Sequence, residues 1–193
     1  MMDSLLETER LLLRPFTAAD IPAIFTIYSD VQTNRFLPWF PLQTREEAAA
    51  LYRARYAALP KGAYRYAVFL KSDPVPVGYV HISEAESRDL GYALLPAARG
   101  RGVMTEACRA VIAQLRRDGV PFVTATHDRQ NEASGRVMQR LGMRYCYSYE
   151  EQWMPKDIPV VFRMYQLNLD GCRTRVYEQY RRNARVSFVE TDV

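Results

Sequence analysis

The sequence predicts a mixed α/β domain with a largely antiparallel first half, on three observations. Its 193 residues are enough for about one domain with its own core. A composition of 48% hydrophobic and 25% charged residues, without a biased tract, is typical of a globular chain. Strand-like and helix-like patterns follow each other in the order β-α-α-β-β-β-α-β-α-β-β, which mixes hairpins with helical crossovers.

The strand-like segments share alternation or an enrichment in β-branched and aromatic residues. They are residues 10–15, 64–70, 77–83, 90–95, 122–126, 145–153 and 160–169. The helical segments share apolar spacing of three and four residues, and they are residues 21–28, 44–58, 103–117 and 131–141. Thr44 stands three residues before Glu47, a capping-box pattern at a helix start.

Two breaks in these patterns organise the chain. Two prolines at residues 36–41 exclude an ordinary helix and predict an aromatic-rich loop. From Gly171 onward the sequence mixes arginine, tyrosine and acids without a clear period. We therefore expect one domain at residues 1–170 and a C-terminal extension at 171–193, to which no secondary structure is assigned.

Charge and cysteine content narrow the class of protein. The net charge is +4, but the basic residues are scattered among acids, which disfavours nucleic acid and suits an anionic cofactor. Three cysteines without a CxxC pair predict no disulfide framework and a reducing, cytoplasmic location. We expect no signal peptide and no membrane span, and two histidines without ligand spacing predict no metal site.

The most informative segment is a strand, a Gly/Arg loop and a helix at residues 90–117. Gly100 and Gly102 let the backbone approach a ligand, and the first amides of the helix are unpaired. With the helix dipole and the charges of Arg99 and Arg101, they predict a site for a pyrophosphate. The alternative is a plain strand-to-helix turn with solvated arginines.

Other nucleotide-binding motifs do not fit this segment. A dinucleotide fold requires glycine where Thr105 stands, and a P-loop requires Gly-Lys-Ser/Thr, which is absent. An unrelated nucleotide-binding enzyme is the weakest of the alternatives.

A second motif is Asn-x-x-Ser at Asn131 and Ser134, followed by Leu-Gly-Met at residues 141–143. Together with the Arg-Gly-Arg-Gly loop at residues 99–102, it resembles the GNAT superfamily of acetyl-CoA-dependent N-acetyltransferases. Within that superfamily it looks like the RimJ/RimL branch of ribosomal-protein alanine acetyltransferases. The resemblance covers residues 8–168 and implies a central, mixed, mostly antiparallel twisted sheet flanked by helices.

The resemblance also implies which residues hold the cofactor. The family signature Arg/Gln-x-x-Gly-x-Gly/Ala, whose amides hold the CoA pyrophosphate, falls on Arg99, Gly102 and Met104. Met104 departs from the small residue usual at the last position. By resemblance the strand at Leu94 and Leu95 pairs with the pantetheine arm. The full set implied is Leu94, Leu95, Arg99, Gly100, Arg101, Gly102, Val103, Met104, Asn131 and Ser134.

The proton donor and the base are the catalytic residues we expect. Many family members carry a tyrosine where this chain has Met138, which cannot donate a proton, so the resemblance assigns the acid to Ser134. The alternative is that Asn131 only caps its helix and Ser134 only satisfies the first turn. Glu84, just before the cofactor strand, is the expected base, unless it belongs to a solvated turn.

Two neighbours of Glu84 are further candidates for the base. His81 and Glu86 lie in the same stretch of strand and turn, whereas His127 is given no role.

The implied reaction is acetyl transfer to a primary amine by direct attack in a ternary complex. The acceptor is a protein N-terminal α-amine or a small-molecule amine, walled by residues 36–40 and by Tyr145, Tyr147 and Tyr149 unless these only pack the core. A homodimer is compatible with the chain. The alternative function is a catalytically silent acyl-CoA sensor.

Overall fold

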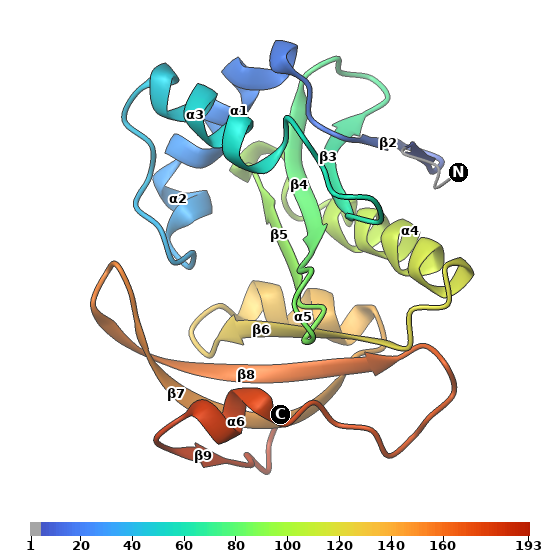
Figure 1. Ribbon diagram of the computed structural model, residues 1–193, viewed down its shortest axis with the longest axis vertical. Coiled ribbons are helices and arrows are strands. Elements are labelled where there is room, and N and C mark those ends of the chain that lie inside the picture. Colours follow the sequence, from blue (N-terminus) through green and yellow to red (C-terminus); the bar gives the residue numbers. More distant parts are fainter. Residues whose placement is uncertain (1–4) are drawn as a thin grey trace. The chain divides into compact units, whose positions relative to one another are not determined.

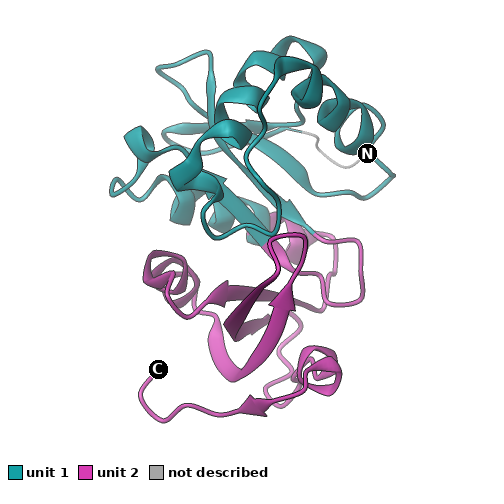
Figure 2. Cartoon of the chain, turned by 90° about the vertical axis from the view of Figure 1, so that its left-hand side faces the viewer, with its two compact units in different colours: residues 1–82, 91–112 teal, residues 83–90, 113–193 magenta. Residues whose placement is uncertain are grey.

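The computed structural model describes residues 5–193, which form two compact units (Figure 2). The first unit comprises Met1–Ile82 and Gly91–Ile112, and the second comprises Ser83–Leu90 and Ala113–Val193. The strands are β1 (Leu6–Glu7), β2 (Leu11–Arg14), β3 (Arg65–Leu70), β4 (Pro76–Ile82), β5 (Leu90–Leu94), β6 (Phe122–Asp128), β7 (Arg144–Trp153), β8 (Ile158–Asn168) and β9 (Ser187–Phe188).

The helices lie singly or in a short run between these strands along the chain. They are η1 (Ala18–Asp20), α1 (Ile21–Ser29), α2 (Val31–Asn34), α3 (Arg45–Arg55), η2 (Pro96–Ala98), α4 (Val103–Arg117), α5 (Glu132–Arg140) and α6 (Gln179–Asn183), where η denotes a 3-10 turn. One sheet has the order β1-β2-β3-β4-β5 and the other the order β6-β8-β7-β9 (Figure 1). The predicted mixed α/β class with mostly antiparallel sheets is confirmed.

In the first unit, helices α1 and α3 bury their apolar sides against strands β3, β4 and β5. Ile24 and Ile27 of α1 are fully buried, in a cluster with Phe69 of β3, Tyr79 of β4 and Ala93 of β5. Helical spacing brings the buried α1 residues to one side, as the sequence pattern predicts. This core fixes the strand that leads to the Gly/Arg loop.

Helix α3 shows both a confirmed start and a corrected end. Thr44 Oγ1 accepts from Glu47 N at 3.2 Å, and Glu47 Oε2 accepts from Thr44 N at 3.2 Å, as the capping box predicts. The helix ends at Arg55 and not at residue 58, because Tyr56 leaves the helical path and buries its ring. The Tyr56 hydroxyl lies 2.6 Å from that of Tyr28.

In the second unit, β7 and β8 form a long antiparallel hairpin whose two faces have different characters. Tyr149 and Phe162 lie opposite each other in the register and belong to an apolar cluster on one face. Ser148 and Arg163, the next pair, point to the other face because successive side chains alternate. His127 of β6 lies opposite Arg163, which extends this polar row across the sheet.

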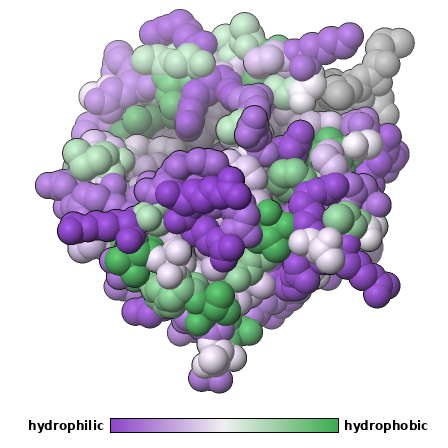
Figure 3. All heavy atoms as spheres, turned by 60° about the horizontal axis from the view of Figure 1, so that its bottom comes forward, coloured by the Kyte–Doolittle hydropathy of each residue, from purple (hydrophilic) through white to green (hydrophobic). Residues whose placement is uncertain are grey.

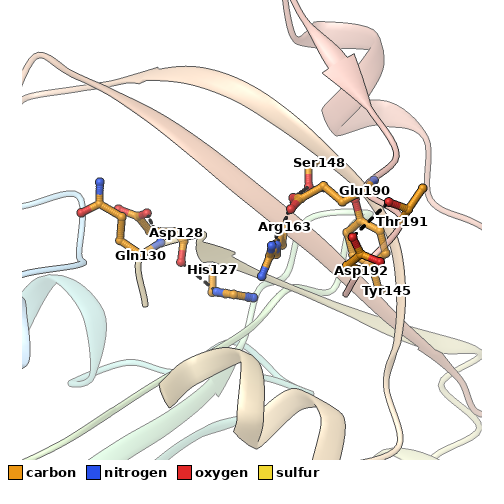
Figure 4. Close-up of polar contacts among 9 residues, drawn as sticks. All are labelled: His127, Asp128, Gln130, Tyr145, Ser148, Arg163, Glu190, Thr191 and Asp192. Atoms are coloured by element: carbon orange, nitrogen blue, oxygen red, sulfur yellow. Dashed lines mark hydrogen bonds and ion pairs between the residues drawn. The ribbon is translucent and has the colours of Figure 1, made fainter. Parts of the chain in front are cut away.

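The C-terminal extension is ordered and contacts both faces of this hairpin. On the apolar face, the ring of Tyr180 in α6 stacks on Tyr149 with centroids 5.5 Å apart and planes at 3°. Strand β9 then pairs with the edge of β7, with Ser148 opposite Phe188. On the polar face, Glu190 Oε1 accepts from Ser148 Oγ at 2.6 Å and also pairs with Arg163 (Figure 4). We call residues 176–190 the C-terminal clip.

Six short elements have no counterpart in the sequence prediction: β1, η1, α2, η2, α6 and β9. Each has between two and five residues. Hydrophobic periodicity needs a longer window to emerge, so a pattern search cannot find them.

Candidate functional site

The loop after strand β5 places backbone donors at the start of helix α4. Gly100 and Gly102 have φ values of 74° and 76°, which L side chains rarely adopt. A Cβ on Gly100 would meet nothing within 4 Å, so the backbone conformation and not crowding requires glycine there. At the start of helix α4, the N–H of Glu106 donates to Gly102 O at 3.0 Å. Among the described residues, the amides from Gly100 to Thr105 have no carbonyl partner outside the helix.

Helix α4 is long enough for its start to attract an anion. It has 15 residues, and the N–H groups of its first turn have no partner within the helix itself. Its aligned peptide dipoles place positive potential at the same point. Val103 and Met104 are 1% and 6% exposed, so their side chains belong to the core and only their backbone faces the loop.

Polar contacts from the N-terminal strand region hold this loop from the side. Glu106 Oε1 accepts from Thr8 Oγ1 at 2.6 Å, and Glu106 Oε2 pairs with Arg10 Nη2 at 2.6 Å. Arg10 Nη1 donates to the carbonyl of Arg101 at 3.1 Å. Burial raises the pKa of Glu106, but these hydrogen bonds outweigh it and lower the pKa overall. This set of contacts was not predicted from the sequence, although an acid in a first helical turn is a recognisable signal.

The two arginines of the loop have different surroundings. Arg101 is exposed. The Arg99 guanidinium reaches back into the first unit, where Nε donates to Leu94 O at 3.0 Å and Nη2 to Thr33 Oγ1 at 3.1 Å. The two arginines look equivalent in the sequence, but the Arg99 side chain contacts other parts of the protein.

Leu94 and Leu95, at the end of strand β5, differ in the direction of their backbone N–H groups. Leu95 N donates to Val77 O of β4 at 2.9 Å, so this amide is already paired. Successive amides of a strand point to opposite sides, so the Leu94 N–H points away from β4. Of the two leucines, only Leu94 directs its backbone away from the neighbouring strand.

Asn131 and Ser134 lie at the start of helix α5, in the second unit. Asn131 Oδ1 accepts from Ser134 N at 3.4 Å, so Asn131 is the N-cap of this helix. Its carbonyl also accepts from Ser134 N at 3.1 Å and from Gly135 N at 3.3 Å. The capping interpretation is correct for Asn131, and it leaves the Ser134 hydroxyl on the first turn. Met138, in place of the family tyrosine, is buried.

His127 supports this helix from strand β6. Its imidazole is 4% exposed and Nδ1 lies 2.8 Å from Asp128 O (Figure 4), so Nδ1 carries the hydrogen because a carbonyl only accepts. Burial is the main cause that lowers the pKa of His127. Nε2 has no hydrogen-bond partner among the described residues, and a Cβ on Gly135 would lie 2.9 Å from it. His127 and Gly135 thus fix how closely α5 approaches the sheet.

The candidate bases have unequal surroundings. Glu84 and Glu86 are exposed in the turn before β5, in the second unit. His81, at the end of β4 in the first unit, stacks on Tyr79 with centroids 5.8 Å apart. A Cβ on Gly91 would lie 2.4 Å from the imidazole Cε1 of His81, so glycine permits this close approach.

Asp89 is the polar residue of this region that the sequence analysis overlooked. Although part of the residue is exposed, its carboxyl group is enclosed, and burial raises its pKa to about 7. Asp89 Oδ1 lies 3.2 Å from Thr124 Oγ1 and 3.3 Å from the Tyr180 hydroxyl. The sequence offered only a weak signal, because Asp89 ends a charged run that is typical of a solvated turn.

The residues expected to wall the acceptor divide into two groups. Tyr147 and Tyr149 are 1% and 4% exposed and pack under the C-terminal clip, so for them the core interpretation is correct. In the aromatic loop of the first unit, Trp39 Nε1 donates to Asn34 Oδ1 at 3.0 Å, and Phe40 is exposed.

The described residues 5–193 contain no group of three or more His, Cys, Asp or Glu side chains arranged to hold a metal ion. None of their helices is both long and apolar enough to cross a membrane.

Comparison with known proteins places this geometry in a family. The sequence model of the acetyltransferase (GNAT) domain matches residues 10–144. The chain is 25% identical over 156 residues to the uncharacterized N-acetyltransferase YnaD of Bacillus subtilis, covering 79% of this chain and 86% of YnaD.

Solved structures share the fold at lower identity. A GNAT-family acetyltransferase from Bacillus anthracis superposes with a TM-score of 0.75 and 21% identity, covering 86% of this chain and 99% of that one. RimL, the ribosomal L7/L12 alpha-N-protein acetyltransferase in complex with coenzyme A, superposes with a TM-score of 0.70 and 19% identity, covering 87% and 99%.

Proposed function

We propose that this chain, which belongs to the GNAT family and is an acetyltransferase, moves the acetyl group of acetyl-CoA to a primary amine. The proposed acceptor is either a protein N-terminal α-amine, the kind of group named for the RimL neighbour, or a small-molecule amine. The observation that carries the proposal is the start of helix α4, where two glycines at positive φ lead into unpaired amides.

The residues at this turn suit the diphosphate of coenzyme A. Backbone amides from Gly100 to Met104 would hold the phosphate oxygens, and the exposed Arg101 would add positive charge. Leu94, whose backbone points away from β4, would face the pantetheine arm, and Asn131 would contact the cofactor beside its capping bond. When bound, acetyl-CoA supplies the thioester carbonyl that the amine attacks.

The chain's own groups then have three tasks. The carbonyl oxygen gains negative charge as the amine nitrogen attacks, and the Leu94 N–H, which points away from β4, would stabilise it. The carbon–sulfur bond breaks, the Ser134 hydroxyl donates a proton to the leaving thiolate, and Ser134 regains a proton from solvent. Glu84 accepts the proton that the amine loses, directly or through a water. The products are the acetylated amine and free coenzyme A.

Asp89 is the second carboxylate to test as base. Its pKa of about 7 is suited to proton transfer near neutral pH, but its oxygen is already shared with Thr124 and Tyr180. Glu84 is exposed in the turn before β5, where solvent or an incoming ammonium can reach its carboxylate. Glu84→Gln and Asp89→Asn separate the two: the true base gives the larger loss of kcat at pH values near neutrality.

The decisive experiment combines binding with turnover. The purified chain is titrated with CoA in a calorimeter and then assayed for thiol release from acetyl-CoA, using peptides with N-terminal serine or alanine and small polyamines. We expect binding, and thiol release with at least one amine. Gly102→Ala, which strains the backbone at positive φ, should weaken CoA binding.

Other outcomes assign other functions. Binding without thiol release on any amine favours the acyl-CoA sensor. If ATP and not CoA raises the unfolding temperature, the cofactor proposal is wrong and an unrelated nucleotide enzyme replaces it.

Self-association is proposed as well, because apolar groups gather at several places on one face of the molecule (Figure 3). The exposed large hydrophobics near the C-terminus are Val186, Phe188, Val189 and Val193. Light scattering on the purified chain tests for a homodimer, and a monomer mass at all concentrations contradicts it.

A further inference from the structure

Arg99 lies at the junction of three parts of the first unit: the end of strand β5, which we call the cofactor strand, the Gly/Arg loop and helix α2. Its Nε donates to Leu94 O at 3.0 Å, and its Nη2 donates to Thr33 Oγ1 at 3.1 Å. The Thr33 hydroxyl in turn lies 3.4 Å from the same Leu94 carbonyl. These three groups form a closed triangle. A planar guanidinium can hold two acceptors at once because its donors are fixed in a fork.

Thr33 is itself held firmly on its side of the triangle. It is 8% exposed, and its N–H donates to the Asp30 carboxylate at 2.6 Å, which caps helix α2. Helix α2 has only four residues, so side-chain contacts and not helical propensity must determine its position. The contact from Arg99 is therefore one of the side-chain interactions that hold this helix.

The next residue continues the chain of contacts toward the aromatic loop. Asn34 is 1% exposed, and its Nδ2 donates to Ile27 O at 2.9 Å and to Asp30 O at 2.8 Å. Its Oδ1 accepts from Trp39 Nε1 at 3.0 Å. Hydrogen bonds and one peptide link thus run from the Leu94 carbonyl through Arg99, Thr33 and Asn34 to Trp39.

We propose that Arg99 is a positioning residue whose guanidinium couples the cofactor strand to helix α2 and the aromatic loop, so that binding of CoA orders the proposed wall of the acceptor site. This inference rests on the proposed function for the identity of the ligand. In this role the Arg99 side chain binds groups of the protein and not phosphate. The backbone amides and Arg101 then bind the phosphate at this loop.

The competing role is a direct phosphate contact by Arg99, and the two roles predict different behaviour of Thr33. If Arg99 couples the segments, Thr33→Val removes the same interaction and should resemble Arg99→Ala. If Arg99 binds phosphate, Thr33→Val has no reason to act like it. Thr33→Ser keeps the hydroxyl and should restore the behaviour of the unmodified chain.

The test uses hydrogen exchange measured by mass spectrometry, with and without CoA, together with calorimetric CoA affinity. In the unmodified chain, CoA should slow exchange both at residues 91–104 and at residues 30–40. In Arg99→Ala and in Thr33→Val, exchange at 30–40 should be about tenfold faster, as expected when a hydrogen bond to a charged group is lost. CoA affinity should change less than about threefold, and the protection at 91–104 should remain.

Two comparisons sharpen the result. The double variant of Arg99 and Thr33 should show no additional effect at residues 30–40, because both changes remove one interaction. Arg101→Ala should show the converse pattern, with weaker CoA binding and unchanged exchange at 30–40. Arg116→Ala, an exposed arginine late in α4, controls for loss of charge alone.

Two results would overturn the inference. The first is a loss of CoA affinity of about tenfold or more in Arg99→Ala, with Thr33→Val like the unmodified chain. The second is exchange at residues 30–40 that neither variant alters. If the unmodified chain fails to bind CoA, the proposed function fails, whereas the exchange comparison without ligand still decides whether Arg99 and Thr33 act together.

Discussion

Replacing Glu190 by glutamine is expected to release the C-terminal clip from the polar face of the β7–β8 hairpin. The carboxylate accepts from Ser148 Oγ at 2.6 Å and from Arg163 Nε at 3.0 Å, and it pairs with the second guanidinium nitrogen. Glutamine keeps the size of the side chain but removes the charge that makes these hydrogen bonds strong. The change therefore tests the ionic contact alone.

The magnitude follows from the pKa of Glu190. The hydrogen bond from Arg163 is the main cause that lowers it from 4.5 to about 2. A lowered pKa favours the ionised form in the folded state, so the contribution to stability is complete above pH 4.5 and is lost as the pH falls to about 2. This interval, at ~1.36 kcal/mol per pH unit, gives about 3 kcal/mol at most. The ion pair lies close to the protein surface, so solvent screening should make the measured loss smaller than this upper value.

Urea unfolding followed by tryptophan fluorescence measures the effect. Trp153 packs against Phe162 in the second unit, so a Trp39→Phe background makes the signal report on that unit. Glu190→Gln should cost the most stability near pH 7, less near pH 3 and almost none near pH 2. Asp192→Asn is the matched control. An equal loss at all pH values, or no loss near pH 7, would refute the reasoning.

Three further changes test other contacts. Burial raises the pKa of Asp89 to about 7, so the free energy of unfolding should fall as the pH rises from about 4 to about 7. Asp89→Asn should abolish this pH dependence in urea titrations, and a pH dependence that persists would contradict the reasoning. Gly78→Ala would place a Cβ 2.2 Å from the Ala93 carbonyl oxygen, so calorimetry should show a loss of about 1–3 kcal/mol, and an unchanged melting temperature would show that the strands can separate at no cost. Ser134→Ala should slow thiol release by about 100-fold while CoA affinity is retained, and an unchanged kcat would place the acid elsewhere.

Local signals made much of the cofactor side readable from the sequence. Gly100 and Gly102 mark positive φ, and the periodic run after them gives the bounds of helix α4 correctly. Asn131 similarly shows as a helix cap, because capping depends on residues three positions apart. Such features are encoded within a few residues and need no knowledge of the rest of the fold.

Contacts between distant residues were beyond the same methods. The partner of Arg99 is Thr33, 66 residues earlier, in a helix too short to show a period. The enclosure of Asp89 depends partly on Tyr180, 91 residues later, in the segment that carried no readable pattern. Charge and spacing alone are typical of solvated side chains for both Arg99 and Asp89. Only the tertiary fold reveals the contacts that these two residues make.

The C-terminal clip also determines how much of this chain can be removed without changing its behaviour in solution. Strand β7 has 10 residues and lies at the border of its sheet except where β9 pairs with it. Cutting the chain before the clip would uncover that border together with the rings of Tyr147 and Tyr149. An uncovered strand border recruits the strands of other molecules. We therefore expect a protein shortened before the C-terminal clip to aggregate even if each copy keeps its fold. The clip would then be needed for solubility.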